Sequence, residues 1–300
     1  MTRVLVTGGT GFVGRQALPL LAARGDEVHA TWSSAPGDER GGVTWHRCDL
    51  LDRAAAAALV ESLRPTHLLH LAWYAVPGKF WDAEENAAWV AASLALLSSF
   101  AEAGGRRATF AGSCAEYEWA DGVLSEASTP LAPATYYGKC KNALREVAEG
   151  FAARRDVGFA WGRIFFVYGP HEHPDRLVSS LARALVRGEP APTSEGSQRR
   201  DFLHARDVAG AFAALLGSDV QGAVNIGSGE AVPVRDVVSA VADAAGRPDL
   251  VQWGALPQRP GDPPLLEADV RRLRDEVGWR PGIPLAEGIA RTVEWWKAQQ

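Results

Sequence analysis

Two side chains near the middle of the chain are spaced so that they could exchange a proton with a substrate. Tyr137 and Lys141 are four residues apart on a helix that the pattern predicts to start near Tyr136, so both project from one helix face. A neighbouring ammonium group stabilises a phenolate and lowers the pKa of the phenol, which makes the pair a usable general acid and base. Ser113, after a strand predicted over 108–111, could hydrogen-bond the same reacting oxygen. Alone, a Tyr–Lys spacing is more often a simple contact within a helix, and what favours catalysis is a cofactor site predicted upstream.

The first fourteen residues predict that cofactor site. Val4-Leu5-Val6 is a short apolar run typical of a buried parallel strand, and a helical pattern begins at Gly14. Gly8 permits the tight turn between them, Gly11 lets the backbone approach a pyrophosphate, and Gly14 allows the helix to pack closely on the strand. The N–H groups at the helix start then face the phosphates. This stretch therefore predicts a dinucleotide-binding site.

The end of the second predicted strand, Glu27–Trp32, bears on which dinucleotide binds. Many NAD-binding proteins place an Asp or Glu there to accept the ribose hydroxyls, whereas this chain continues with Ser33-Ser34 and has no acid until Asp38. A missing carboxylate removes repulsion against a 2′-phosphate, so the sequence favours NADP, with NAD as the alternative. Arg15 or Arg40 could bind that phosphate.

Strands and helices alternate along the first half of the chain. The predicted strands cover 4–6, 27–32, 43–48, 66–71, 108–111 and 159–166, and the predicted helices cover 53–63, 84–103 and a stretch from 136. This alternation implies an α/β fold with a doubly wound parallel Rossmann sheet, in which ligands bind at the carboxyl ends of the strands.

The composition changes from Tyr168 onward, where loops rich in Pro and Arg separate short elements. We predict helices over 176–187, 207–216, 235–245, 268–277 and 285–298, a loop over 189–200 and a short strand over 223–226. We therefore expect a Rossmann domain over 1–166 with a return segment at about 203–226. A smaller, discontinuous substrate lobe would comprise 167–202 and 227–300.

Composition and charge exclude several classes of protein. Of the 300 residues, 47% are hydrophobic and 22% are charged, which is typical of a globular protein. The net charge of −5 gives no basic surface for nucleic acid. Three cysteines, at 48, 114 and 140, fit neither a disulfide framework nor a metal site, which indicates a reducing compartment. No signal peptide or membrane-spanning run is predicted, so we expect a cytoplasmic protein without a metal.

Several stretches, in order along nearly the whole chain, resemble the extended short-chain dehydrogenase/reductases, especially those that act on nucleotide sugars (the NAD-dependent epimerase/dehydratase family). These stretches are Gly8–Gly14, Ser113, Pro133–Lys141, Arg163–Pro170, Arg200–His204, Asn225–Gly229 and Arg259–Asp262. The resemblance implies an NAD(P)-dependent enzyme with a nucleotide-sugar substrate. It also implies a homodimer formed through the helices at 84–103 and 136–153.

The resemblance assigns roles to individual residues. It makes Ser113, Tyr137 and Lys141 the catalytic set, and Arg200 and Arg259 a clamp on the sugar diphosphate. The residues expected around the cofactor are Gly8, Thr10, Gly11, Phe12, Val13, Gly14, Asp49, Leu50, Leu71, Ala72, Tyr137 and Lys141. Those expected around the substrate are Ser113, Phe166, His171, Leu177, Arg200 and Arg259.

Departures from the family pattern narrow the predicted reaction. Sugar dehydratases of this family carry Asp-Glu directly after the catalytic hydroxyl residue, where this chain has Cys114-Ala115. Glu116 lies one residue after the position of the family's glutamate, and on a strand that shift points its side chain to the opposite face. The sequence therefore disfavours sugar dehydration. The usual Asn of the Arg163–Tyr168 segment is Phe166 here, which indicates an unusual sugar or pose.

A 4-ketoreductase that acts on an NDP-4-keto-6-deoxyhexose in deoxysugar biosynthesis is therefore the function we predict first. The alternatives are an NDP-sugar C4 epimerase and an epimerase/reductase of the GDP-fucose synthase kind. The latter would use Cys114 and His171 as an acid/base pair, but Cys114 directly follows Ser113, and strand alternation would turn it away from the sugar. A non-enzymatic binding protein on the same fold is a weaker alternative, because the Ser–Tyr–Lys set is intact.

Overall fold

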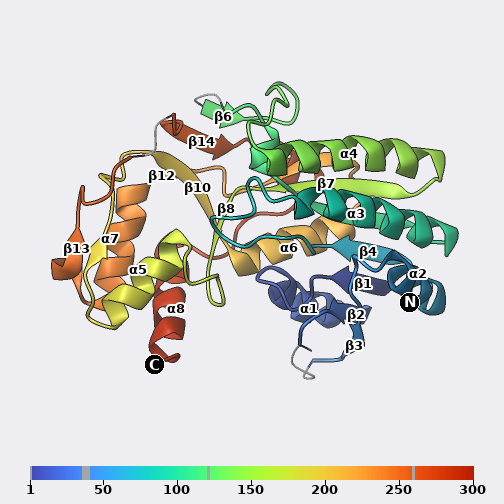
Figure 1. Cartoon of the computed structure of the whole chain (residues 1–300), viewed down its shortest axis with the longest axis horizontal. Coiled ribbons are helices and arrows are strands. Elements are labelled where there is room, and N and C mark those ends of the chain that lie inside the picture. The colour runs from blue at the N-terminus through green and yellow to red at the C-terminus, as the bar shows by residue number, and fades with distance from the viewer. Residues whose placement is uncertain (1, 36–40, 120–121, 259–260) are drawn as a thin grey trace.

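The structure is a computed structural model that describes residues 2–35, 41–119, 122–258 and 261–300. A larger part is built around one parallel sheet, and a smaller lobe lies beside it (Figure 1). The C-terminal helix ends in the smaller lobe (Figure 1).

A seven-stranded, fully parallel sheet forms the centre of the larger part. Its strands are β1 (Arg3–Thr7), β2 (Glu27–Trp32), β3 (Val43–Arg47), β4 (His67–His70), β5 (Arg107–Ser113), β7 (Gly158–Ile164) and β11 (Gly222–Ile226). They lie in the order β11-β7-β5-β4-β1-β2-β3. Strand order reverses beside β1, so a ligand crevice is expected where β1 and β4 end.

Helices cover both faces of this sheet. On one face are α1 (Gly14–Ala23) and α6 (Ala205–Leu216), and on the other are α2 (Arg53–Leu63), α3 (Glu85–Glu102) and α4 (Tyr136–Arg154). Val4 and Val6 pack toward the first face and Leu5 toward the second, which explains why β1 is apolar at every position from 4 to 6. The predicted doubly wound Rossmann fold is confirmed. The two helices expected at a dimer interface, α3 and α4, lie side by side (Figure 1).

The start of α4 is fixed by two local features. The hydroxyl of Thr135 accepts a hydrogen bond from the N–H of Gly138 and so caps the helix. A side chain at Gly138 would collide with the carbonyl oxygen of Ala115, so only glycine lets α4 approach the end of β5 this closely. Tyr137 is thereby held in the first helical turn, next to the carboxyl end of β5.

The smaller lobe combines a mixed sheet with three helices. Its strands are β6 (Gly122–Leu124), β8 (Phe166–Tyr168), β10 (Arg199–His204), β12 (Ala231–Pro233) and β14 (Leu265–Ala268), with β9 (Ala191–Pro192) and β13 (Val251–Gln252) as a separate pair. Its helices are α5 (Leu177–Val186), α7 (Val234–Ala245) and α8 (Leu285–Lys297), which share one apolar core. Two short 3₁₀ helices, η1 (Cys114–Glu116) and η2 (Pro248–Leu250), and a short π-helix, η3 (Arg272–Glu276), complete the described elements. No helix in the described ranges is long and apolar enough to span a membrane.

Three of the expected elements differ in extent from the prediction, because strands of the lobe pair with distant segments. The strand predicted over 159–166 ends at Ile164, because Phe166 begins β8 and pairs with Phe202 of β10. The loop predicted over 189–200 gives way at Arg199 to β10, which pairs with β8, β12 and β14. The helix predicted over 268–277 is shorter than expected, because β14 extends to Ala268 and the helical residues are those of the π-helix η3, Arg272–Glu276.

Candidate active site

The glycine-rich loop between β1 and α1 has the geometry that a dinucleotide requires. Gly8 has φ +73°, in the left-handed region, and its carbonyl accepts a hydrogen bond from the N–H of Gly11 at 2.9 Å. A side chain at Gly14 would collide with that same carbonyl, and one at Gly8 would lie 2.8 Å from the backbone nitrogen of Ala72. In the described structure no side chain caps α1 at Val13, and the N–H groups of Arg15 and Gln16 donate to the carbonyls of Gly11 and Val13. The loop therefore fits a pyrophosphate.

At the other end of the expected cofactor site, Trp32 closes β2 where a carboxylate is often found. The guanidinium of Arg47, from the neighbouring end of β3, lies 5.7 Å from the centre of the Trp32 ring. Arg15 points elsewhere, since it donates to the carbonyl of Thr10 and contacts His171. Arg40, the other cation proposed for a 2′-phosphate, lies outside the described residues.

Other residues predicted around the cofactor lie at the ends of β3 and β4. Leu50 is buried beside Cys48 and Ala56, and Ala72 packs against this cluster. The carboxylate of Asp49 accepts from the N–H of Leu51, which fixes the turn after β3. The backbone at Leu71 donates to Thr7 and so continues the parallel pairing of β4 with β1.

Ser113, Tyr137 and Lys141 come together at the carboxyl end of β5. Ser113 is the last residue of β5, and its side chain lies close enough to Tyr137 to lower the pKa of the phenol. Lys141 is 3% exposed, and its Nζ donates to the carbonyl of Ala111 at 2.8 Å. The same Nζ lies 3.7 Å from the centre of the Trp73 ring and 6.0 Å from that of Tyr137.

Burial dominates the acid–base properties of this group. It lowers the pKa of Lys141 to about 7, against the opposing field of Glu116. Burial also raises the pKa of Tyr137, and the strongest influence in the opposite direction is the hydrogen bond to Ser113. Ser113 is therefore the main influence that opposes the rise in the pKa of Tyr137, whereas the sequence indicated Lys141.

Aromatic side chains surround Tyr137, and the spacing of motifs did not identify them. Phe80 and Trp81 present edges at ring-centre distances of 4.9 and 5.8 Å, and Trp73 lies at 6.4 Å. The carbonyl of Trp81 also accepts from the N–H of Tyr137 at 2.9 Å. Trp119 extends the cluster, 6.2 Å from Trp81. The sequence feature that could have indicated this cluster is the series of tryptophans that follows β4, because aromatic rings pack against the apolar face of a sugar.

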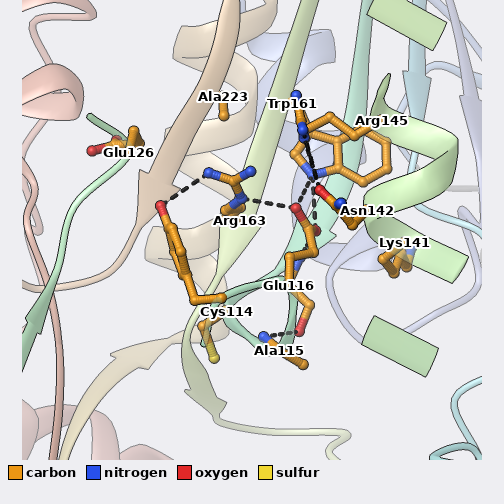
Figure 2. A network of polar contacts seen from close by, with 12 residues as sticks. Cys114, Ala115, Glu116, Glu126, Lys141, Asn142, Arg145, Trp161, Arg163 and Ala223 are labelled. Atoms are coloured by element: carbon orange, nitrogen blue, oxygen red, sulfur yellow. Dashed lines mark hydrogen bonds and ion pairs between the residues drawn. The ribbon is translucent and has the colours of Figure 1, made fainter. Parts of the chain in front are cut away.

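Cys114 and Glu116 do not lie on a strand, so the alternation argument applied to them is wrong. The chain leaves β5 after Ser113 and forms the turn η1, in which the Ser113 hydroxyl accepts from the N–H of Ala115. Cys114 is packed with Tyr117 and Leu266, and burial raises the pKa of its thiol to about 12. Glu116 turns inward to bind Arg163 and Trp161 (Figure 2).

His171 lies against Arg15 and Trp295. It has φ +70°, its Nδ1 contacts the guanidinium of Arg15 at 2.8 Å, and its ring lies 4.7 Å from that of Trp295 on α8. Burial, and then the charge of Arg15, lower the pKa of His171. Cys114 and His171 thus have different neighbours in this structure, a buried apolar cluster for the thiol and Arg15 with Trp295 for the imidazole.

The remaining predicted substrate residues lie along the lobe. Arg200 is 4% exposed and is held by the carboxylate of Asp262 at 2.6 Å and the carbonyl of Pro263 at 2.8 Å. Its guanidinium lies 5.6 Å from the ring of Phe166. Leu177 begins α5 and is 38% exposed. Arg259, the proposed second arm of the clamp, lies outside the described residues.

A cavity of about 540 Å³ opens elsewhere in the molecule, between η3, the start of α8 and β10. Its walls include Tyr168, Phe202, Trp279 and Leu285, and none of the three predicted catalytic residues. We place the candidate site at Ser113 instead, because the titratable side chains converge there. In the described part of the chain no group of His, Cys, Asp and Glu is arranged to hold a metal ion.

Known proteins resemble the chain over its whole length. The UDP-glucose 4-epimerase of Streptomyces lividans is 28% identical over 322 residues, covering 98% of this chain and 95% of that protein. Among solved structures, the UDP-glucose 4-epimerase of Thermus thermophilus in complex with NAD is 29% identical, with a TM-score of 0.85 and complete coverage of both chains. MoeE5 in complex with UDP-glucuronic acid and NAD is 34% identical, with a TM-score of 0.84, covering 99% of this chain and 100% of that one.

The model of the NAD-dependent epimerase/dehydratase family matches residues 4–227. This match spans the glycine loop, Ser113, Tyr137 and Lys141, the positions whose geometry suits a dinucleotide and a proton transfer. The chain therefore belongs to the NAD-dependent epimerase/dehydratase family, the extended type of short-chain dehydrogenase/reductase.

Proposed function

We propose that the protein is a nucleotide-sugar C4 epimerase. The observation that supports this proposal is that Ser113, Tyr137 and Lys141 converge at one place, while Cys114 is packed in a buried cluster and His171 lies against Arg15. A single acid–base centre suits oxidation and reduction at one carbinol carbon. Dehydration and epimerisation next to a ketone both need further acids or bases, which Cys114 and His171 do not supply here.

The chain's own residues would act on the hydroxyl at C4. A nicotinamide ring, when bound beyond the glycine loop, supplies a reversible acceptor for the hydrogen on that carbon. Tyr137 removes the hydroxyl proton and later returns it, and Ser113 donates a hydrogen bond to the same oxygen. Lys141 supplies a positive charge beside the phenolate that this transfer leaves. Phe80 and Trp81 exclude water from the phenol, which strengthens both interactions.

The substrate we propose is a UDP-linked hexose or hexuronic acid. The names of the relatives support it: two are UDP-glucose 4-epimerases, and MoeE5 was solved with UDP-glucose and with UDP-glucuronic acid. Arg200 is rigidly held by Asp262 and Pro263, so it could meet the diphosphate at little cost in side-chain entropy.

A second candidate is 4-ketoreduction with NADPH, and the adenosine end of the cofactor site favours it. Trp32 stands where a carboxylate would repel a 2′-phosphate, and the Arg47 guanidinium beside it could attract one. The two candidates differ in what must be added. An epimerase returns its cofactor to the starting state in each turnover, whereas a reductase consumes one NADPH per product.

The test is to incubate the purified protein with UDP-galactose, UDP-glucose or UDP-glucuronic acid, each with and without added NAD. Anomeric proton NMR then follows conversion to the C4 epimer. We expect a 4-epimer from at least one of these sugars, with no reductant consumed. No conversion of any of them, together with NADPH oxidation on an NDP-4-keto-6-deoxyhexose, would replace this proposal with the reductase.

A further inference from the structure

Glu116 is a fully buried carboxylate that the reaction described above does not use. It is 0% exposed, and its Oε1 accepts a hydrogen bond from the backbone N–H of Ser113 at 2.7 Å. Both of its oxygens accept from Nε1 of Trp161, at 2.9 and 3.0 Å, and Oε2 pairs with Nε of Arg163 at 2.8 Å (Figure 2). A carboxylate with this many partners is fixed in one position.

The partners of Glu116 are themselves anchored in the sheet. Arg163 on β7 also donates to the phenol oxygen of Tyr117 at 3.0 Å, and Tyr117 donates to Asn225 on β11 at 2.8 Å. Gly112 supplies the necessary space, because a side chain there would collide with the indole of Trp161 and the carboxylate of Glu116. The network is therefore rigid, and it ends at the backbone of Ser113.

The same network reaches Lys141 through Trp161. The indole that donates to Glu116 has its ring centre 5.9 Å from Nζ of Lys141. The other titratable groups near this ammonium are Tyr137, on the same helix, and His70 of β4, which is neutral because burial lowers its pKa to about 3. The carboxylate of Glu116, which is paired with Arg163, acts on Lys141 in the opposite direction to burial and favours its protonated form.

We propose that Glu116 is a positioning residue that fixes the main chain at Ser113 and supplies the negative charge that keeps Lys141 an ammonium ion. Only the predicted effect of Glu116 on turnover rests on the proposed function. Its effect on Lys141 belongs to the folded protein and can be measured without a substrate. Glu116 thus links the hydroxyl and the ammonium group of the catalytic set through one buried carboxylate.

The test replaces Glu116 by its neutral isostere, Glu116→Gln, and follows Lys141 directly. The chain has only four lysines, so ¹³C-labelled lysine gives a simple spectrum in which Lys141→Arg identifies the signal. We expect the midpoint of the Lys141 titration to fall by about one pH unit or more in Glu116→Gln. In Glu118→Gln, which changes an exposed carboxylate two residues away, the midpoint should stay at the parent value. An unchanged midpoint in Glu116→Gln would overturn the proposal.

Two further variants keep the test decisive. Glu116→Gln leaves Arg163 unpaired, so the double variant Glu116→Gln/Arg163→Gln removes both buried charges and serves if the single variant does not fold. It should show a downward shift that is smaller than that of Glu116→Gln, because the repulsion between Arg163 and Lys141 is removed together with the carboxylate. Glu116→Asp keeps the charge, and its Lys141 midpoint should lie closer to the parent than that of Glu116→Gln. Equal shifts in Asp and Gln variants would mean that the charge is not the cause.

Turnover provides the second readout. With an active substrate, kcat of Glu116→Gln at pH 8 should fall about tenfold for each unit of the Lys141 shift, with KM for the sugar nearly unchanged. If the parent converts no sugar but Glu116→Gln still lowers the midpoint of the Lys141 titration, the proposed function is refuted and this inference stands. A higher KM together with a lower kcat in Glu116→Gln, with the midpoint of the Lys141 titration unchanged, would assign Glu116 a purely structural role.

Discussion

At the scale of residues, Tyr137 depends on one polar partner in an aromatic environment. Ser113 lowers the pKa of its phenol, and Phe80, Trp81 and Trp73 surround its ring. Tyr137→Phe removes the proton donor and acceptor but keeps these ring contacts. We therefore expect kcat to fall by about 10²–10⁴-fold, while the affinity for the nicotinamide cofactor stays within a few-fold. Steady-state turnover and calorimetric titration with the cofactor measure the two quantities, and near-parent turnover would contradict the assigned role.

The same scale shows what motif spacing can and cannot predict. Ser113, Tyr137 and Lys141 could be identified because a Tyr–Lys pair on one helix face and a serine at a strand end are local patterns. The position of Glu116 could not, because its partners Trp161 and Arg163 are 45 and 47 residues away in sequence. Those contacts turn the chain out of the strand after Ser113, which no local pattern encodes.

At the scale of elements, a buried histidine ties β4 to its neighbours. His70 contacts Thr7 of β1 through Nδ1 at 2.6 Å and Ser93 of α3 through Nε2 at 2.8 Å, and burial lowers its pKa to about 3. In the unfolded chain a histidine titrates near 6.5, so below that pH the unfolded state binds a proton that the folded state does not. Folding stability from His70 is therefore present above about pH 6.5 and is lost as the pH falls toward 3.

We expect His70→Gln to make the free energy of unfolding less dependent on pH. Between pH 7 and pH 5 the parent should lose about 2 kcal/mol more than this variant, which is one proton over the titrating part of that range. Urea unfolding at a series of pH values gives the comparison. His173→Gln is the matched control, since that side chain is 44% exposed and should leave the parent's pH dependence unchanged. Parallel curves for parent and His70→Gln would refute the assignment.

Elements in the first half of the chain were more predictable than those in the lobe. The strands of the parallel sheet are apolar at successive positions because both faces are covered, and Asp52 and Thr135 mark helix starts with side-chain caps. The sequence of β10 resembles a loop because it carries two adjacent charged residues, Arg200 and Asp201, and both are buried in the structure. Asp262 neutralises the arginine, and the N–H groups of Ser228 and Gly229 satisfy the aspartate, so the strand is stable only in the assembled lobe.

At the scale of the whole molecule, direct contacts connect the glycine loop to the lobe. Arg15 on α1 donates to the carbonyl of Thr10 and contacts His171, whose ring packs on Trp295 of α8. These contacts engage Arg15, one of the two cations that the sequence offered for a 2′-phosphate, and His171, one member of the acid–base pair that it offered for a second proton transfer. Under the proposed function, proton transfer in the described part of the molecule takes place at Ser113 and Tyr137.

The most direct test of that central claim is the fate of solvent deuterium during turnover. The protein is incubated in D₂O with the UDP-sugar that it converts, and the product is analysed by proton NMR and mass spectrometry. One acid–base centre at C4 predicts inversion at C4 with no deuterium on any carbon, because the hydrogen removed from C4 is returned to it. Deuterium at C3 or C5 that disappears in Cys114→Ser or His171→Asn would contradict the account, since it would require a second proton transfer by those residues.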